Sequence, residues 1–194
     1  MGLGLLCIIA ALLLTGYNLC DQNRADKESQ EILSLLDHAF PEPETGEQEE
    51  AEEEFYEKYP EVEMPTKEVN GNRCIGKLEI LALGLELPII DNCERASIKN
   101  APGLYSGSAY MKNMIIGGHN YKRHFGRIGK LLLGDQIKFT DMDGHEFVYE
   151  VVEKEIVQEN EIEQMMQGEW DLTLFTCDYN RDYRRTVRCA LVSE

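Results

Sequence analysis

Short apolar stretches separated by Gly and Asp turns run from about residue 74 to the end of this chain, and they constrain its fold more than any other feature. Apolar and polar side chains alternate with a period of two in several of them, as in a strand with one buried face. Many short strands with little helix are typical of a closed, antiparallel-rich barrel. The predicted strands cover residues 76–80, 85–90, 114–116, 135–140, 146–152, 172–176 and 186–192.

One hairpin and one helix can be placed within this mainly β region. Residues 141–144 read Asp-Met-Asp-Gly between two predicted strands, and Gly144 is free to adopt the positive φ of a tight turn. We therefore expect the strands on either side of this turn to pair. Apolar residues between 160 and 167 predict one short helix.

The N-terminal segment predicts contact with a lipid bilayer. Leu3 to Leu19 contains no charged side chain, and seventeen such residues are close to the minimum that spans a membrane. A cleaved signal peptide is the alternative, but the basic start and the small-residue cleavage site of such a peptide are missing. We favour an uncleaved single-pass anchor.

The next two segments connect this anchor to the β region. Apolar residues recur at helical spacing between Arg24 and Phe40, which predicts an amphipathic helix packed on the domain or on the membrane surface. Residues 42–63 are strongly acidic and predict a solvated spacer. The expected organisation is an anchor or signal segment (1–20), an amphipathic helix (21–40), an acidic flexible linker (41–72) and a β-barrel domain (73–194).

The net charge of the chain is -17 at pH 7, and most of the excess acid lies in the spacer. Nucleic-acid binding depends on clustered Lys and Arg that contact phosphates. The charge therefore argues against nucleic acid as a partner.

Three residues within the β region suggest covalent chemistry. Cys177 ends the predicted strand Leu172–Thr176, His119 follows a strand and two glycines, and Arg184 begins the next strand. Only a thiolate attacks carbonyl groups efficiently, and a neighbouring base or cation promotes its formation. We interpret Cys177 as a nucleophile, His119 as its acid–base partner and Arg184 as a cationic group beside them.

These motifs resemble those of the sortases. The similarity rests on Thr-Leu-Phe-Thr-Cys177, on Gly-His119-Asn upstream and on the following arginine, and it extends over roughly residues 75 to 192. The resemblance implies an eight-stranded barrel of the sortase type and a cysteine transpeptidase activity. It also implies that Cys177 attacks a Thr-Gly bond in a C-terminal sorting signal, that His119 transfers protons, and that Arg184 binds the carbonyl oxygen or the signal's backbone.

The same resemblance implies the partners and the cellular location. Secreted proteins with sorting signals would be the acyl donors, and a cell-wall precursor or a pilin would supply the amine. The chemistry requires no metal and no organic cofactor. The catalytic domain would lie outside the cell and be held at the membrane by the N-terminal segment.

Several alternatives stay open at this stage. Arg185 could act in place of Arg184, although strand alternation points it to the opposite face. A non-catalytic, surface-tethered barrel that binds a partner is the rival function, and a cysteine hydrolase with the same three residues is a closer variant. The enzyme requires His119 and Arg184 on opposite sides of Cys177.

Other Cys, His and Asp residues predict no chemistry of their own. Cys74 and Cys93 are either a disulfide or two unpaired thiols, and Cys189 is expected in the core. We expect His124 and His145 to be exposed to solvent. Asp141, Asp143 and Glu146 are expected to serve the hairpin turn rather than calcium. Residues 42–46, Glu-Pro-Glu-Thr-Gly, resemble part of a sorting signal, but these are also ordinary linker residues.

Overall fold

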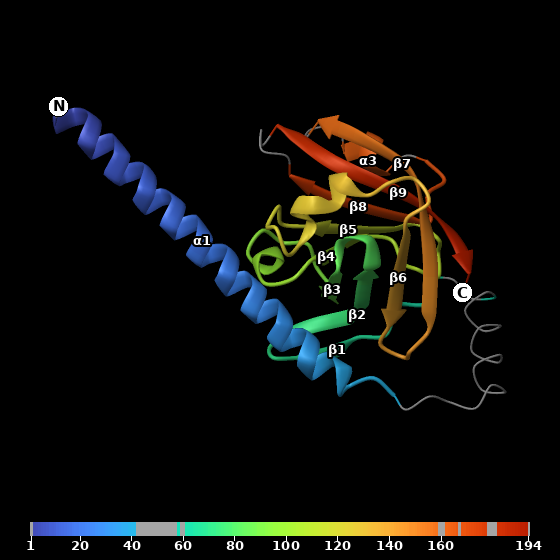
Figure 1. Cartoon of the computed structure of the whole chain (residues 1–194). Helices are drawn as coiled ribbons and strands as arrows, with labels where there is room; N and C mark the ends of the chain where they lie inside the picture. Colours follow the sequence, from blue (N-terminus) through green and yellow to red (C-terminus); the bar gives the residue numbers. More distant parts are fainter. Residues whose placement is uncertain are drawn as a thin grey trace.

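Nine strands form a single sheet that closes on itself (Figure 1). The structure is a computed structural model that describes residues 2–41, 58, 61–158, 162–166, 168–177 and 182–193. The strands are β1 Lys67–Val69, β2 Asn72–Ile80, β3 Leu85–Ile90, β4 Gly103–Ser106, β5 Met114–Gly118, β6 Gln136–Asp141, β7 Glu146–Gln158, β8 Leu172–Cys177 and β9 Tyr183–Ser193.

The strand order is β1-β2-β3-β4-β5-β8-β9-β7-β6, and pairing of β2 with β6 closes eight of these strands into a barrel. The short strand β1 adds to β2 at the outside of that ring. The β3–β4 and β5–β8 pairs are parallel, and the other pairs are antiparallel. The predicted eight-stranded barrel is confirmed.

The barrel is filled by the alternating apolar side chains that predicted its strands. Leu78 and Ile80 of β2, Phe139 of β6 and Tyr149 of β7 are fully buried in one continuous cluster. The short helix η3, Phe125–Lys130, adds Phe125 and Ile128 to the same core. Two further 3-10 turns are η1 Leu81–Leu83 and η2 Ser97–Lys99, and a short helix, α3, covers Ile162–Met166.

The predicted hairpin and the predicted short helix are both present. Thr140 pairs with Glu146 across the turn, and Gly144 has a φ of 98°. β7 is longer than expected and reaches Gln158, because its second half pairs along β9 as far as Tyr183. β4 was not predicted, since its four residues are too few to show a period.

The N-terminal region is one uninterrupted helix, α1 Gly2–Asp37. Residues 4–20 are exposed throughout, and this half projects away from the barrel (Figure 1). The helix is long and apolar enough to cross a membrane, judged by length and composition alone. The amphipathic helix expected after the anchor is therefore the continuation of the same helix.

Of the two surfaces expected to bind the second half of α1, the domain or the membrane, the structure shows packing on the domain. Ala25, Ser29, Ile32 and Leu36 recur at spacings of three and four residues, and all four are buried. Ile32 and Leu36 belong to a cluster with residues of β1, β2 and β3 and with Met142 of the hairpin turn. This contact fixes the helix on one side of the barrel.

The expected linker 41–72 is shorter than the sequence suggested. β1 and the start of β2 lie inside that range, because Val69 is buried against α1 and Lys67–Val69 pairs with β2. Residues 42–57 lie outside the described part of the chain, and this includes the sorting-signal-like segment 42–46.

We expect Leu36→Ala to lower the free energy of unfolding by about 2–5 kcal/mol, because it leaves a cavity where α1 meets the barrel. Leu35→Ala is the matched control: that side chain is 45 % exposed, and its truncation should change stability by less than about 0.5 kcal/mol. Urea unfolding of the full chain in mild detergent, followed by the fluorescence of Trp170, measures both. Equal effects of the two variants would contradict the packing described for α1.

Candidate active site

The candidate site lies at the end of β8, where Cys177 is the last residue of the strand and is exposed. β8 lies between β5, to which it is parallel, and β9, to which it is antiparallel. Cys177 is paired directly with Arg184 on β9. Directly opposed residues of two strands carry their side chains on the same face of the sheet. Arg184 is therefore the cross-strand neighbour of the thiol.

His119 reaches the same level from the other side of β8. Gly118, the last residue of β5, is paired with Thr176 of β8. The residues that follow them, His119 and Cys177, therefore lie side by side at the same end of the sheet. The sheet thus places His119 and Arg184 on opposite sides of Cys177, the arrangement expected of an enzyme. Their catalytic roles stay predictions.

The register also separates the two arginines. Arg185 is paired with Thr176, one residue before the thiol, so its side chain lies on the opposite face from that of Arg184. Its guanidinium packs over Gly129 of η3, where an added Cβ would lie 2.2 Å from Nη1. Arg184 instead lies over the ring of Phe175, with Cζ 5.2 Å from the ring centroid. This geometry favours Arg184 as the residue beside Cys177.

Gly117 and Gly118 allow close packing immediately before His119. A Cβ on Gly117 would lie 2.4 Å from Cys93 Sγ and 2.6 Å from the ring of Phe175. A Cβ on Gly118 would lie 2.6 Å from the ring of Phe125, on the core side. Because these distances are well inside van der Waals contact, a Cβ at either position would clash unless its neighbours moved, and glycine is the residue that fits.

The imidazole of His119 is held by its neighbours in the chain. Its Nδ1 lies 3.2 Å from Oδ1 of Asn120. Its ring stacks on that of Tyr121, with a centroid separation of 4.0 Å and an interplanar angle of 8°. The ring itself is partly exposed, so it can reach a bound substrate.

Burial raises the pKa values of the other three thiols of the barrel domain. Burial raises the pKa of Cys189 to about 12 and the pKa of Cys74 to about 11. Burial also raises the pKa of Cys93 to about 11, although a hydrogen bond with the Gly117 backbone and the charge of Arg184 act in the opposite direction. Cys74 and Cys93 are free thiols, so the disulfide considered from the sequence is absent, and Cys189 lies in the core as predicted.

An aromatic surface adjoins the thiol on this face of the sheet. Phe175, two residues before Cys177 on β8, contacts Tyr105 of β4 edge to face, with ring centroids 5.4 Å apart. Tyr105 is 39 % exposed and Cys93 packs against the same cluster. A substrate that reaches Cys177 along this face would meet these side chains.

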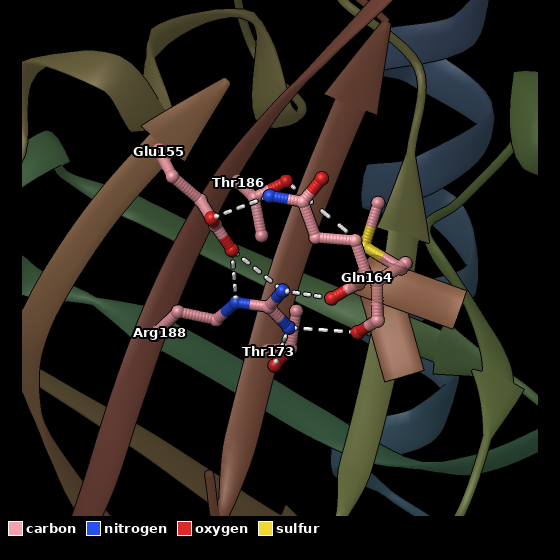
Figure 2. A network of polar contacts seen from close by, with 6 residues as sticks. Glu155, Gln164, Thr173, Thr186 and Arg188 are labelled. Carbon is pink, nitrogen blue, oxygen red and sulfur yellow. Dashed lines mark hydrogen bonds and ion pairs between the residues drawn. The ribbon is translucent and has the colours of Figure 1, made fainter. Parts of the chain in front are cut away.

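Arg188, for which the sequence predicted no role, anchors the short helix α3 beside this face. Its guanidinium, only 2 % exposed, lies 2.6 Å from Oε1 of Glu155. It also donates to Oγ1 of Thr173 at 3.0 Å, and to the carbonyl oxygens of Gln164 and Met165 at 2.8 Å each (Figure 2). These bonds fix α3 over β8 and β9. Alternation along β9 was the available signal, since Arg188 lies four residues from Arg184 and so on the same face.

Two histidines expected in solvent are not exposed, and both predictions were wrong. His124 is 1 % exposed because α1 covers it, and desolvation lowers its pKa to about 4. The side chain of His145 packs against the hairpin turn, where its Nδ1 lies 3.1 Å from Oδ2 of Asp141. Asp141 also accepts hydrogen bonds from the backbone N–H groups of Asp143 and His145, which is the turn role predicted for it.

Among the residues that the structure describes, no group of three or more His, Cys, Asp or Glu side chains could hold a metal ion. The candidate site therefore consists of a thiol, an imidazole and a guanidinium beside an aromatic surface.

The comparisons with known proteins identify the family. A family model described as the sortase domain matches residues 78–192, which is more than half of the chain. The chain belongs to the sortase family. Sortase D from Bacillus subtilis is 32 % identical over 107 residues, which are 53 % of this chain and 53 % of that protein. The chain thus aligns with only about half the length of this curated relative.

Solved sortase structures have the same fold. A sortase D5 transpeptidase from Clostridium perfringens superposes with a TM-score of 0.59 at 22 % identity, covering 87 % of this chain and 98 % of that one. Sortase A from Corynebacterium diphtheriae gives 0.60 at 17 % identity, covering 92 % and 96 %. Sortase C from Streptococcus pneumoniae gives 0.56 at 23 % identity, covering 62 % and 70 %.

We expect Cys177 to be alkylated at pH 7 at least about 100-fold faster than Cys74, Cys93 or Cys189. A thiol with a pKa of 11 or more has a thiolate fraction on the order of 10⁻⁴ or less at pH 7, and burial also excludes the reagent. Because these pKa values are raised, increasing the pH to 9 should increase the thiolate fraction of the buried groups about 100-fold. Peptide mapping after brief treatment with iodoacetamide measures each site, and modification of Cys93 as fast as that of Cys177 would contradict the assignment.

Proposed function

We propose that this sortase is a membrane-anchored cysteine transpeptidase that cleaves a Thr-Gly-type bond in an LPXTG-like C-terminal sorting signal. The observation that carries the proposal is the pairing of Cys177 with Arg184, with His119 leaving β5 at the same level on the other side. An exposed thiol between an imidazole and a guanidinium suits acyl transfer. A barrel that only binds a partner has no need for an exposed thiol in that position.

The proposed first half-reaction forms a thioester. The thiol proton of Cys177 first passes to His119, and the resulting thiolate attacks the carbonyl carbon of the Thr-Gly bond. Arg184 donates hydrogen bonds to the carbonyl oxygen as negative charge develops on it. The C–N bond then breaks, and His119 gives a proton to the leaving amine. The acyl fragment remains on Cys177.

The second half-reaction transfers this fragment to an amine. His119 accepts a proton from the incoming amine, which attacks the thioester carbon and expels the Cys177 thiolate. The amine belongs to a cell-wall precursor or to a pilin. Water in place of the amine would make the same site a hydrolase.

We also propose a location at the cell membrane of a Gram-positive bacterium, with the barrel on the outer side. Family membership supports the cell envelope, and the exposed apolar half of α1 supports a single-pass anchor. Because α1 continues unbroken into the half that packs on the barrel, the domain would sit directly on the bilayer surface.

The test is ligation by the full chain in detergent. Wild-type protein, a library of Leu-Pro-x-Thr-Gly peptides and an amine are incubated, and intact-protein mass spectrometry detects acyl-enzyme. We expect wild type to accumulate a thioester and form ligated product, and Cys177→Ala to form neither while keeping its fold. Capture by Cys177→Ala equal to that of wild type would refute the proposal.

The two neighbouring arginines provide the matched control. Arg184→Ala should lower kcat/KM by about 10²–10³-fold, the usual effect of losing an oxyanion donor. Arg185→Ala, whose side chain faces η3, should retain kcat/KM within about threefold. The reverse order would assign the role to Arg185.

A further inference from the structure

The packed half of α1 contacts the segment that carries His119. The hydroxyl of Tyr121 donates a hydrogen bond to Oδ2 of Asp21 at 2.5 Å, which joins positions 100 residues apart in the sequence. The other carboxylate oxygen of Asp21 is 3.2 Å from Nη2 of Arg24, one turn further along the helix. The carboxylate of Asp21 is therefore held by the helix and presented to Tyr121.

Tyr121 connects this helix to the imidazole. Its ring is only 9 % exposed, and the ring of His119 stacks on it almost in parallel at 4.0 Å. Burial, followed by the bond to Asp21, raises the pKa of Tyr121 to about 12, so the phenol remains a donor at neutral pH. A parallel stack at this separation restricts the orientation of the partly exposed imidazole ring.

The rest of the turn after His119 is held by the same stretch of helix. Arg123 forms an ion pair with Asp26 at 3.4 Å, and His124 is buried beside Ala25. The ring of Tyr121 also contacts that of His124, with centroids 5.6 Å apart. Residues 121–124 thus form the docking surface for the middle of α1.

We propose that Asp21 and Tyr121 are positioning residues for His119, so that docking of the membrane-proximal helix sets the orientation of the acid–base group. The proposal rests on the proposed function of His119. Asp21 holds Tyr121 through its hydroxyl, and Tyr121 holds the imidazole through its ring. Asp21 follows directly after the apolar half of the same helix. The position of the membrane anchor is therefore linked to the orientation of His119 through Asp21 and Tyr121.

The test compares four variants of the full chain in detergent: Asp21→Ala, Tyr121→Phe, Tyr121→Leu and the control Asp26→Ala. Asp26 lies on the same helix and contacts the same turn, but it bonds to Arg123 and not to Tyr121. Tyr121→Phe keeps the ring and the packing, and removes only the hydroxyl. It therefore remains informative if Asp21→Ala loosens the helix.

Asp21→Ala and Tyr121→Phe should lower kcat of ligation about tenfold and leave the KM of the peptide within about twofold, because His119 transfers protons and does not bind the peptide. Tyr121→Leu should lower kcat further, since it also removes the stacked ring. Asp26→Ala should match wild type in both constants. Equal loss in Asp21→Ala and Asp26→Ala, or no loss in Asp21→Ala and Tyr121→Phe, would overturn the proposal.

A second readout does not depend on activity. The chain has four histidines, so the imidazole signals of His119 can be assigned in a ¹H–¹³C spectrum by comparison with His119→Gln. The stacked ring of Tyr121 should shift these signals, and Asp21→Ala and Tyr121→Leu should move them toward the values of a free imidazole, whereas Asp26→Ala should not. If wild type forms no thioester, the proposed function fails. The spectra then still decide whether Asp21 and Tyr121 position the ring, and unchanged signals in both variants would refute it.

Discussion

The pairing of β8 with its two neighbours is the constraint on which the site depends. One parallel and one antiparallel ladder meet on this strand, and together they bring His119, Cys177 and Arg184 to the same level. Because side chains alternate between the faces of a sheet, a shift of one residue in either ladder would move one partner to the opposite face. The placement of these three side chains is therefore specified by the backbone hydrogen bonds of the two ladders.

The surroundings of these strands stabilise that pairing from both sides. On the core face, Gly118 lets Phe125 approach β5 closely. On the face that carries the thiol, Gly117 lets Cys93 approach β5, and Arg188 ties α3 to β8 and β9. A buried Arg–Glu pair is costly to break, since removing one partner leaves an uncompensated charge. Glu155 and Arg188 thus favour one arrangement of the segment beside the thiol.

The local features of this structure were predictable from the sequence. The hairpin at Gly144, the buried stripe of α1 and the level at which Cys177 and Arg184 leave their strands all follow from periodicity and turn chemistry over a few residues. The parallel pairing of β5 with β8 that brings His119 beside them links strands far apart in the chain, and it was not predicted. From the sequence we expected only that the three residues converge.

The predictions that failed concern contacts over long distances in sequence. His124 looked solvent-exposed because nothing near it in the chain indicates that α1 lies above it. The contact of Tyr121 with Asp21 was missed for the same reason. His145 failed differently, because the carboxylate of Asp141 was expected to bond the turn backbone but not the imidazole as well.

The most direct measurement tests whether His119 and Arg184 lie beside Cys177, and it does not depend on activity. In a Cys93→Ser background, which removes the neighbouring thiol, a short bifunctional thiol reagent is applied to His119→Cys, Arg184→Cys and Arg185→Cys. The pairing described here predicts a crosslink to Cys177 in the first two variants and none in Arg185→Cys, whose side chain lies on the opposite face. A crosslink in Arg185→Cys, together with its absence in Arg184→Cys and His119→Cys, would contradict the register and with it the active site.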